Sequence, residues 1–452
     1  MAFQTCFFCL LRRNLCAAGV RTRESSMIRS KALLSAVFCL SLIRAADAGD
    51  TLSIATGKVE ITGPIGYPMG GYGARKGVSQ GVHDPLLAKI LLVKSGEQQF
   101  GVVTYDMLAF LSERVAREAK EKLGIAYVLQ VASHTHSGPV PKSLASFKDD
   151  PFIRDVETCV LDALKAAQSR YVPARVSVGE TSVLIGHNRR KVNPDGSVTM
   201  FWRNAERIPT APVDPKAGII RFSDAANKTL AVMVNYACHS VVLGPDNLQY
   251  SADWPGFMYR YVEARLGDPA VCYYIPGASG DINPYNDKQP VNQDGFGVAQ
   301  KTGETVGNAV LAALNAMAPG VSDPDLQIAQ ELTQFKDRFA AQKTVPVQVT
   351  RILLGKDTAI IGIPGEVFVS HQIDLKARSP LPRTFLAGYA FGGEGGFAGY
   401  IPTIEAAMQG GYGASYATRI EVGAGEWIID RSIIWIYERL GKLRDVPDVP
   451  RN

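Results

Sequence analysis

Short apolar runs recur along the chain from about residue 88 to residue 363, and each run ends at a polar or glycine-rich stretch. Runs that are this short and apolar at nearly every position are typical of strands buried on both faces of a sheet. We therefore predict strands at residues 88–94, 101–105, 127–132, 230–236, 271–275 and 358–363.

Stretches with helical spacing of their apolar residues separate these runs. They predict helices at residues 112–123, 155–167, 258–266, 302–316 and 428–443. Strands that alternate with amphipathic helices favour the α/β class, with a mixed β-sheet core flanked by helices. Residues 49–452 contain no visible repeat or Pro/Ser-rich linker, so we expect one large domain there.

The positive charge of the chain belongs to its first 48 residues. This segment holds seven of the 48 basic residues and two of the 43 acidic ones, which leaves 41 of each in the remainder. A domain without net charge gives no support to a nucleic-acid-binding function. Four of the seven cysteines also lie in this segment, so the remainder is not a disulfide scaffold.

The same segment resembles a secretory signal. A basic start at Met27 precedes an apolar run at residues 32–43 and the sequence Ala46-Asp47-Ala48, an A-x-A cleavage pattern. We expect residues 27–48 to be a signal peptide and the protein to be secreted or periplasmic. A permanent membrane anchor is the alternative, although the apolar run is short for a span.

Two histidines directly follow the predicted strand at residues 127–132. Residues i and i+2 at a strand end point to the same side, so His134 and His136 could bind one metal ion together. Alternatively, one of them binds the metal and the other serves the chemistry. Two hydrogen-bonded structural histidines would give the same pattern.

Further potential ligands follow other predicted strands. His239 comes shortly after the run at residues 230–236, and Glu366 lies just after the run at 358–363. A lone histidine is more often a structural core residue, and a carboxylate there could simply favour a helix N-terminus. All of these residues nevertheless repeat one arrangement, in which a strand ends and a metal-binding side chain follows.

The loop at residues 276–284 is rich in small residues and contains Asp281, which could orient a histidine or a water molecule. It lacks the Lys-Ser/Thr end of a phosphate-binding loop. The chain also shows no Gly-x-Ser-x-Gly elbow joined to a credible triad. A plain structural turn remains the alternative for this loop. The glycine-rich stretch at 388–425 suggests backbone that turns sharply or approaches a ligand.

Several of these blocks occur in an order that is similar to one known family. They are residues 81–86, 103–106, 133–139, 187–189, 235–239, 251–253, 277–284, 364–368, 398–403 and 412–415. In this order they resemble the catalytic domain of the neutral, non-lysosomal ceramidases, over residues 57–424. The block His134-Thr135-His136-Ser137-Gly138-Pro139, together with the later blocks, is the most specific part of the resemblance.

The resemblance implies a zinc-dependent hydrolase with one Zn²⁺ per chain. The implied ligands are His134, His239, Glu366 and Tyr400. Tyr400 would not have been chosen from spacing alone. The implied reaction is hydrolysis of the amide bond of an N-acylated lipid such as ceramide, so a lipid-like substrate and peripheral membrane contact are expected. No obligate protein partner is inferred.

The resemblance also implies roles for residues near the metal. His136, Arg189 and Tyr412 match positions that orient substrate or stabilise charge. On this interpretation Tyr412 polarises the carbonyl oxygen, His136 transfers a proton to the leaving amine, and Asp281 fixes a ligand or a substrate hydroxyl.

One position departs from the family pattern. The family sequence Gly-Asp-Val-Ser-Pro becomes Gly280-Asp281-Ile282-Asn283-Pro284, so Asn283 replaces a serine that is implicated in the active site. An amide can donate and accept hydrogen bonds but is bulkier and cannot act as a nucleophile. Two alternatives therefore stay open: a zinc hydrolase of another amide or ester, and a non-catalytic binding protein with the same fold.

Overall fold

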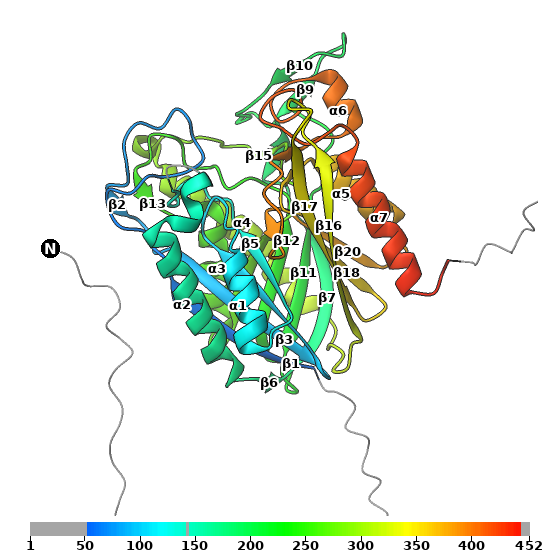
Figure 1. Cartoon of the computed structure of the whole chain (residues 1–452). Helices are drawn as coiled ribbons and strands as arrows, with labels where there is room; N and C mark the ends of the chain where they lie inside the picture. The colour runs from blue at the N-terminus through cyan, green and yellow to red at the C-terminus, as the bar shows by residue number, and fades with distance from the viewer. Residues whose placement is uncertain (1–51, 142–143, 444–452) are drawn as a thin grey trace, which may run out of the picture. The chain divides into compact units, whose positions relative to one another are not determined.

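The computed structural model describes residues 52–141 and 144–443. Three sheets of four or more strands form the framework of this part of the chain (Figure 1). The first has the order β21-β5-β4-β3-β1-β6, with bounds Ala390–Phe391, Tyr127–Ala132, Gln98–Tyr105, Leu87–Ser95, Ser53–Glu60 and Val172–Pro173. The second has the order β14-β12-β11-β7, with bounds Val271–Pro276, Thr229–Tyr236, Lys216–Ser223 and Arg175–Ser182. The third has the order β16-β17-β18-β20, with bounds Leu326–Lys336, Thr344–Leu354, Thr358–Gly362 and Arg383–Ala387.

Helices cover the outer faces of these sheets. They are α1 (Glu113–Leu123), α2 (Pro151–Gln168), α3 (Asp253–Leu266), α4 (Gly295–Ala316), α5 (Val369–Arg378), α6 (Ile404–Gln409) and α7 (Ala424–Arg439). Helices α1 to α4 pack on one side of the first two sheets, and α5 and α7 pack on the third sheet. The layers therefore follow the order helix, sheet, sheet, helix.

The central strands are apolar on both faces because each face enters a different core. In β12, Val232 and Val234 pack toward helices α1 to α4, whereas Ala231 and Met233 pack toward the third sheet. This division follows from the two-residue period of a strand. It confirms the interpretation of the continuous apolar runs as strands that are buried on both sides.

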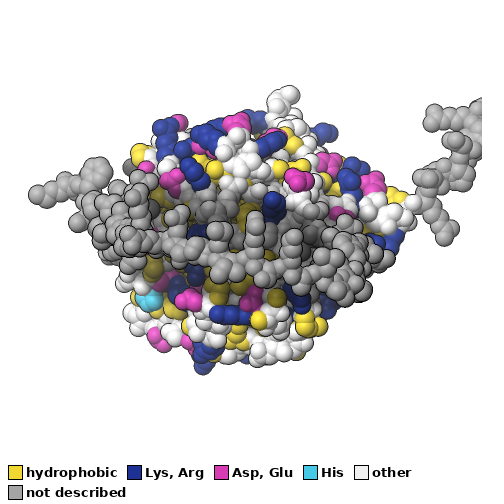
Figure 2. Space-filling model, turned by 90° about the horizontal axis from the view of Figure 1, so that it is seen from below, with side chains coloured by type: hydrophobic (Ala, Val, Ile, Leu, Met, Phe, Trp, Pro, Cys, Tyr) yellow, Lys and Arg dark blue, Asp and Glu magenta, His cyan; other side chains and the backbone are white. Residues whose placement is uncertain are grey.

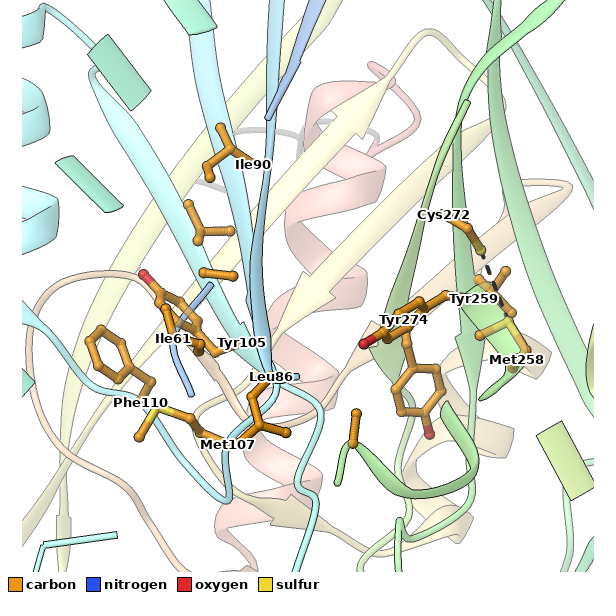
Figure 3. Close-up of a cluster of buried hydrophobic side chains, with 14 of the residues drawn as sticks. Ile61, Leu86, Ile90, Tyr105, Met107, Phe110, Met258, Tyr259, Cys272 and Tyr274 are labelled. Atoms are coloured by element: carbon orange, nitrogen blue, oxygen red, sulfur yellow. Dashed lines mark hydrogen bonds between the residues drawn. The ribbon is translucent and has the colours of Figure 1, made fainter. Parts of the chain in front are cut away.

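Figure 3 shows part of the core between the helices and the first two sheets. The rings of Tyr105 and Phe110 stack with their centres 4.2 Å apart, and the sulfur atoms of Cys272 and Met258 are 4.0 Å apart. The Tyr273 hydroxyl, on the edge strand β14, donates to the carbonyl oxygen of Ile90 in β3 (2.7 Å). The edge strand of the second sheet is therefore bonded to an interior strand of the first.

The sheets are mixed, as predicted, and their parallel pairs decide where the chemistry lies. Strands β4 and β5, β12 and β14, and β18 and β20 run parallel, whereas the other neighbours in the three sheets are antiparallel. The carboxyl ends of these strands carry the loops that hold the candidate site. This edge is where open α/β sheets bind ligands.

All six predicted strands are confirmed, five of them to within a residue at each end, whereas β4 begins three residues before the predicted start; several helix bounds were wrong. Helix α2 begins at Pro151 because the Asp150 carboxylate accepts the N–H groups of the next turn (3.0 and 3.3 Å). Helices α3 and α4 also begin earlier than predicted, at Asp253 and Gly295. The last helix, α7, covers Ala424–Arg439 and not residues 428–443.

The proposed leader at residues 1–48 lies outside the described residues. Within the described part of the chain, no helix combines the length and hydrophobicity that a membrane span requires. Figure 2 shows one end of the molecule, where side chains of both charge signs lie among apolar ones. This mixed surface agrees with the balance of charges in the sequence.

A buried carboxylate joins two of the sequence blocks outside the candidate site. Asp84 accepts hydrogen bonds from the Ser251 hydroxyl (2.6 Å) and the Ala252 N–H (3.0 Å), and it pairs with Arg260 (3.1 Å). Burial would raise the pKa of Asp84, but His83 and these partners hold it below its usual value. Asp84 lies between β2 (Gly81–Val82) and β3, and it therefore fixes the start of α3 to this loop.

Asp84→Asn is expected to lower the free energy of unfolding at pH 7 by about 2–3 kcal/mol, since charge-assisted hydrogen bonds are lost. The lowered folded-state pKa means that this contribution is present above the unfolded-state pKa and is lost as pH falls through the folded value. The difference in Tm between wild type and variant should therefore shrink at acid pH. Asp149→Asn, at an exposed position, is the control and should show no such difference.

Candidate metal and active site

Three histidine side chains converge at the carboxyl ends of the strands. His134 and His136 follow β5, and His239 follows β12. Each offers one ring nitrogen, and these nitrogens lie within 4.8 Å of one another. The Nε2 atoms of His134 and His136 are 3.3 Å apart, and the rings of His134 and His239 are 5.1 Å apart. The cluster could therefore hold a metal ion.

Local backbone conformation aims the first histidine into the cluster. His134 has φ 59°, in the left-handed region that a residue with a side chain rarely adopts. Its N–H donates to the carbonyl oxygen of Met107 (3.0 Å), which follows β4. Strain of this kind persists where the surroundings enforce it, and it is common at functional sites.

The orientation of two rings makes the centre of the cluster electron-rich. The His134 Nδ1 lies 2.7 Å from the carbonyl oxygen of Leu108, and the His239 Nδ1 lies 3.1 Å from that of Ile282. A carbonyl oxygen only accepts, so both Nδ1 atoms donate, and the neutral form of a ring held in this way keeps its lone pair on Nε2. Carbonyl partners of this kind orient histidines that bind metals.

Glu366 lies directly against these lone pairs. Its Oε2 is 3.1 Å from the Nε2 of His239 and 3.4 Å from that of His134. Burial alone would raise the pKa of the Glu366 carboxyl, but the two imidazoles hold it well below its usual value. Burial lowers the pKa of His239 to about 4, so this ring is neutral at pH 7.

The Nε2 atoms of His134 and His239 and the Glu366 carboxylate therefore face one another in a buried place. Such an arrangement is unfavourable without a shared cation or proton. Nitrogen and carboxylate donors in a buried cluster fit a divalent transition ion such as zinc. The chemistry of this donor set thus fits a bound metal, although it does not select one ion.

Tyr400, the fourth ligand that the resemblance implied, lies on the Glu366 side of the cluster. Strands β19 (Glu366–Val367) and β22 (Tyr400–Ile401) are parallel, with Glu366 paired to Tyr400. Burial and the Glu366 carboxylate raise the pKa of the Tyr400 hydroxyl well above its usual value, while Arg189 opposes this shift. Its place among the ligands stays a prediction.

Arg189 is a buried cation at the edge of the cluster. Its guanidinium donates to the carbonyl oxygen of Gly280 (2.6 Å) and to the side-chain oxygen of Asn283 (3.1 Å). The Asn283 amide in turn donates to Asp287 (2.9 Å). Asn283, which replaces the family's serine, therefore holds Arg189 in place and is itself held by a buried carboxylate.

Aromatic rings surround this guanidinium. The rings of Trp202, Tyr400 and Tyr412 lie 5.1, 5.5 and 5.2 Å from the Arg189 carbon. The Tyr412 ring also packs against Trp202 (5.3 Å) and Tyr400 (5.2 Å). Tyr412 thus lies beside Arg189, and Trp202 is a neighbour that sequence reasoning missed.

Asp281 does not touch a histidine with its side chain. Its carboxylate accepts from the Asn188 amide (2.8 Å) and from the Val369 N–H (2.8 Å). The following residue, Ile282, supplies the carbonyl oxygen that orients His239. Asp281 therefore fixes the loop that positions a candidate ligand, and its effect on His239 is indirect.

Tyr389 is a site residue that the sequence did not single out. Its ring stacks on His134 with centres 4.1 Å apart, and its hydroxyl lies 3.5 Å from Glu366 and 3.1 Å from the Ser279 hydroxyl. It follows β20 at a left-handed φ of 53°. The same strand-end rule would have found it if the short strand Arg383–Ala387 had been predicted.

Comparisons with known proteins agree with this geometry. The model of the neutral/alkaline non-lysosomal ceramidase family, N-terminal region, matches residues 52–322, which is more than half of the chain. The crystal structure of neutral ceramidase from Pseudomonas aeruginosa is 14% identical, with a TM-score of 0.69 over 89% of this chain and 76% of that one. A structure described as a ceramidase complexed with C2 is 15% identical, with a TM-score of 0.70 over 89% and 77%. At such identities the two structures show that the fold is similar, and the match to the family model shows the family. The chain belongs to the neutral/alkaline non-lysosomal ceramidase family.

Proposed function

We propose that this protein is a zinc-dependent amidase that hydrolyses the amide bond of an N-acylated lipid such as ceramide. The observation that carries the proposal is the buried cluster in which His134 and His239 direct lone pairs at Glu366. Family membership supports the substrate class, and the donor set supports a divalent ion.

His134, His239 and Glu366 would hold the ion, with Tyr400 or His136 as a further ligand. A divalent cation held there supplies a Lewis acid and lowers the pKa of a bound water to about 7. The carbonyl oxygens of Leu108 and Ile282 keep the ligand rings in the required tautomer.

In the reaction the C–N bond of the amide breaks, the acyl carbon gains the oxygen of water, and the amine gains a proton. His136 is suited to move that proton. Burial and the neighbouring imidazoles lower its pKa well below the usual value, so it is neutral and able to accept a proton at pH 7. Within the described chain its Nδ1 has no hydrogen-bond partner.

Negative charge develops on the carbonyl oxygen as water adds. Arg189 and Tyr412 lie on one side of the cluster and would stabilise this charge. Within the described residues the Nε of Arg189 is buried without a hydrogen-bond partner, so it has a donor to spare. Preorganised donors of this kind usually make the largest contribution to such reactions.

A different amide or ester is the second candidate substrate. Asn283 favours this alternative, because its side chain bonds to Arg189 at the position where the family pattern has a smaller serine. We also propose, from the sequence pattern alone, that residues 27–48 direct the protein to secretion.

Metal analysis combined with product analysis tests the function. Purified protein should contain about one zinc per chain, and short-chain N-acylsphingosine should yield fatty acid and sphingoid base in equal amounts. Faster release from simple acyl esters than from the amide would favour the second candidate. A protein that binds no metal and releases neither product would contradict both.

Gly71→Ala is expected to lower kcat for the amide by about 100-fold, because small displacements of a reacting group are costly. Gly71 lies against the ring of His136, and an added methyl group would overlap that ring. The zinc content should stay close to the wild-type value if His136 transfers protons, and should fall if His136 is a ligand. Steady-state kinetics and metal analysis of one preparation measure both effects.

Gly66→Ala is the matched control for this change. Gly66 has φ +86° and Gly71 has φ +94°, so both alanines suffer similar backbone strain. An added methyl group at Gly66 meets no atom within 4 Å. Equal losses of kcat in the two variants would show that strain, and not the position of His136, causes the effect.

A further inference from the structure

Large apolar side chains are left exposed on the segments that border the candidate site. They come from the β9–β10 hairpin (Arg190–Val192 and Val198–Met200), the turn between β16 and β17, helix α6 and the loop after it. We refer to the following five as the apolar rim: Val192, Phe339, Ile404, Met408 and Tyr416. Their exposed fractions range from 46% for Val192 to 78% for Met408.

Hydrogen bonds between these segments make the rim one surface. Arg190, at the root of the β9–β10 hairpin, donates to the carbonyl oxygens of Gly410 (2.5 Å) and Ala406 (3.3 Å). Arg338 lies beside Phe339. Its side chain donates to the carbonyl oxygen of Ala414 (2.5 Å), and its backbone N–H donates to the carbonyl oxygen of Arg419 (2.7 Å). Both segments therefore pack on the chain between residues 406 and 419.

The rim is continuous with the candidate site. The Tyr416 ring packs on the Tyr412 ring (5.5 Å), which packs on the Tyr400 ring (5.2 Å). Tyr416 is exposed, Tyr412 is half-buried and Tyr400 is buried beside Glu366. A row of aromatic rings thus leads from the rim to the carboxylate.

We propose that the apolar rim inserts into the surface of a lipid bilayer and delivers the substrate from the bilayer to the site. This inference rests on the proposed function, because a substrate with acyl chains resides in the bilayer. Ile404 and Met408 lie one turn apart on the same face of α6, where both can enter the lipid together. Tyrosine is also suited to the boundary between headgroups and acyl chains.

The charges around the rim indicate how it binds. Arg419 is paired with Asp337 (2.7 Å), and the bordering segments carry exposed side chains of both signs, such as Lys191, Asp195 and Glu405. Exposed basic side chains on these segments, such as Lys336 and Lys343, thus lie among acidic ones, and the described residues of the rim form no purely basic cluster of the kind that recognises anionic lipids. Binding should depend on apolar insertion, and it should change little with salt or with the fraction of anionic lipid.

The test compares wild type with Ile404→Gln/Met408→Gln in the same full chain, so that residues 1–51 contribute equally. Sedimentation with phosphatidylcholine vesicles should show binding that the double variant weakens about tenfold or more, as loss of two buried apolar side chains requires. Val172→Gln/Val321→Gln removes two exposed apolar side chains from the strand ends opposite the rim and should bind like wild type.

Two substrates separate this proposal from the proposed function. The double variant should hydrolyse a water-soluble short-chain amide as fast as wild type, but a long-chain amide in vesicles about tenfold more slowly. Unchanged vesicle binding in the double variant would overturn the docking surface. It would also be overturned if wild type did not bind vesicles and light scattering showed dimers that the double variant does not form. If neither amide is cleaved while the variant still loses vesicle binding, docking stands and the proposed function fails.

Discussion

Replacing His239 with alanine is expected to lower the affinity for zinc by roughly 100-fold or more, since even loss of an outer partner of a metal ligand costs about 10- to 100-fold. His239 is 1% exposed, and its Nε2 lies 3.1 Å from Glu366. Amide hydrolysis should fall with metal content, because the Lewis acid and the activated water are lost together.

The fold should survive this substitution. The substitution removes the contacts of the His239 ring with Glu366 and with the Ile282 carbonyl oxygen, while the core contacts of β12 on both faces of its sheet remain. We therefore expect a Tm close to that of the metal-free wild type, measured by circular dichroism. Competition with a chromophoric chelator measures the affinity for zinc.

His83→Ala is the control, since His83 is a partly exposed histidine that stacks on Phe296 outside the cluster. Its zinc content should equal that of wild type. Full zinc binding by His239→Ala would remove His239 from the ligand set and, with it, the basis of the proposed hydrolase mechanism.

The elements that could be predicted from the sequence are those whose burial gives a simple pattern of apolar residues. Strands β3, β4, β5, β12, β14 and β18 face a core on both sides, so they read as continuous apolar runs. Strand β16 (Leu326–Lys336) was missed because one of its faces is mostly polar. Helix α4 was predicted too short because Gly295 and Gly297 hide its start. Gly303 is there because α4 packs against the backbone of α3 at Trp254.

Site residues were likewise predicted only where they follow a strand that could itself be predicted. His134, His239 and Glu366 were found because each follows a strand that the apolar pattern made visible. Tyr389 was missed because its strand β20 is short and begins with an arginine. Tyr400 could not be reached from local pattern at all, since its two-residue strand depends on pairing with Glu366 from a distant segment.

Contacts between side chains were the least predictable feature. The sequence suggested that Asp281 would orient a histidine or a water, or fix a ligand or a substrate hydroxyl; among the described residues its carboxylate binds Asn188 and the Val369 N–H. Asn283 stood out as a departure, but its link to Arg189 and Asp287 appears only when the loops meet in space. The contacts with Asn188, Val369 and Arg189 join residues 93, 88 and 94 positions apart, beyond the reach of any local rule.

Arg189→Met is expected to lower kcat/KM for the amide by about 10²- to 10³-fold, the usual cost of removing one preorganised donor to a developing oxyanion. The zinc content should be unchanged, because no atom of Arg189 belongs to the histidine cluster. This combination of lost rate and retained metal distinguishes charge stabilisation from metal binding. Steady-state kinetics with a short-chain amide, together with metal analysis, measures both.

Loss of a buried arginine also destabilises the fold, so the control must share that effect. Arg221 is 4% exposed, as Arg189 is, and it bonds to Ser177, Asn227 and the Ala318 carbonyl oxygen away from the site. Arg221→Met should therefore lower Tm by a similar amount and leave kcat/KM near the wild-type value. Arg189→Lys should recover only part of the rate, because an ammonium cannot bond to Gly280 and Asn283 in the forked geometry of a guanidinium. Equal rate losses in Arg189→Met and Arg221→Met would assign the effect to stability and remove Arg189 from the chemistry.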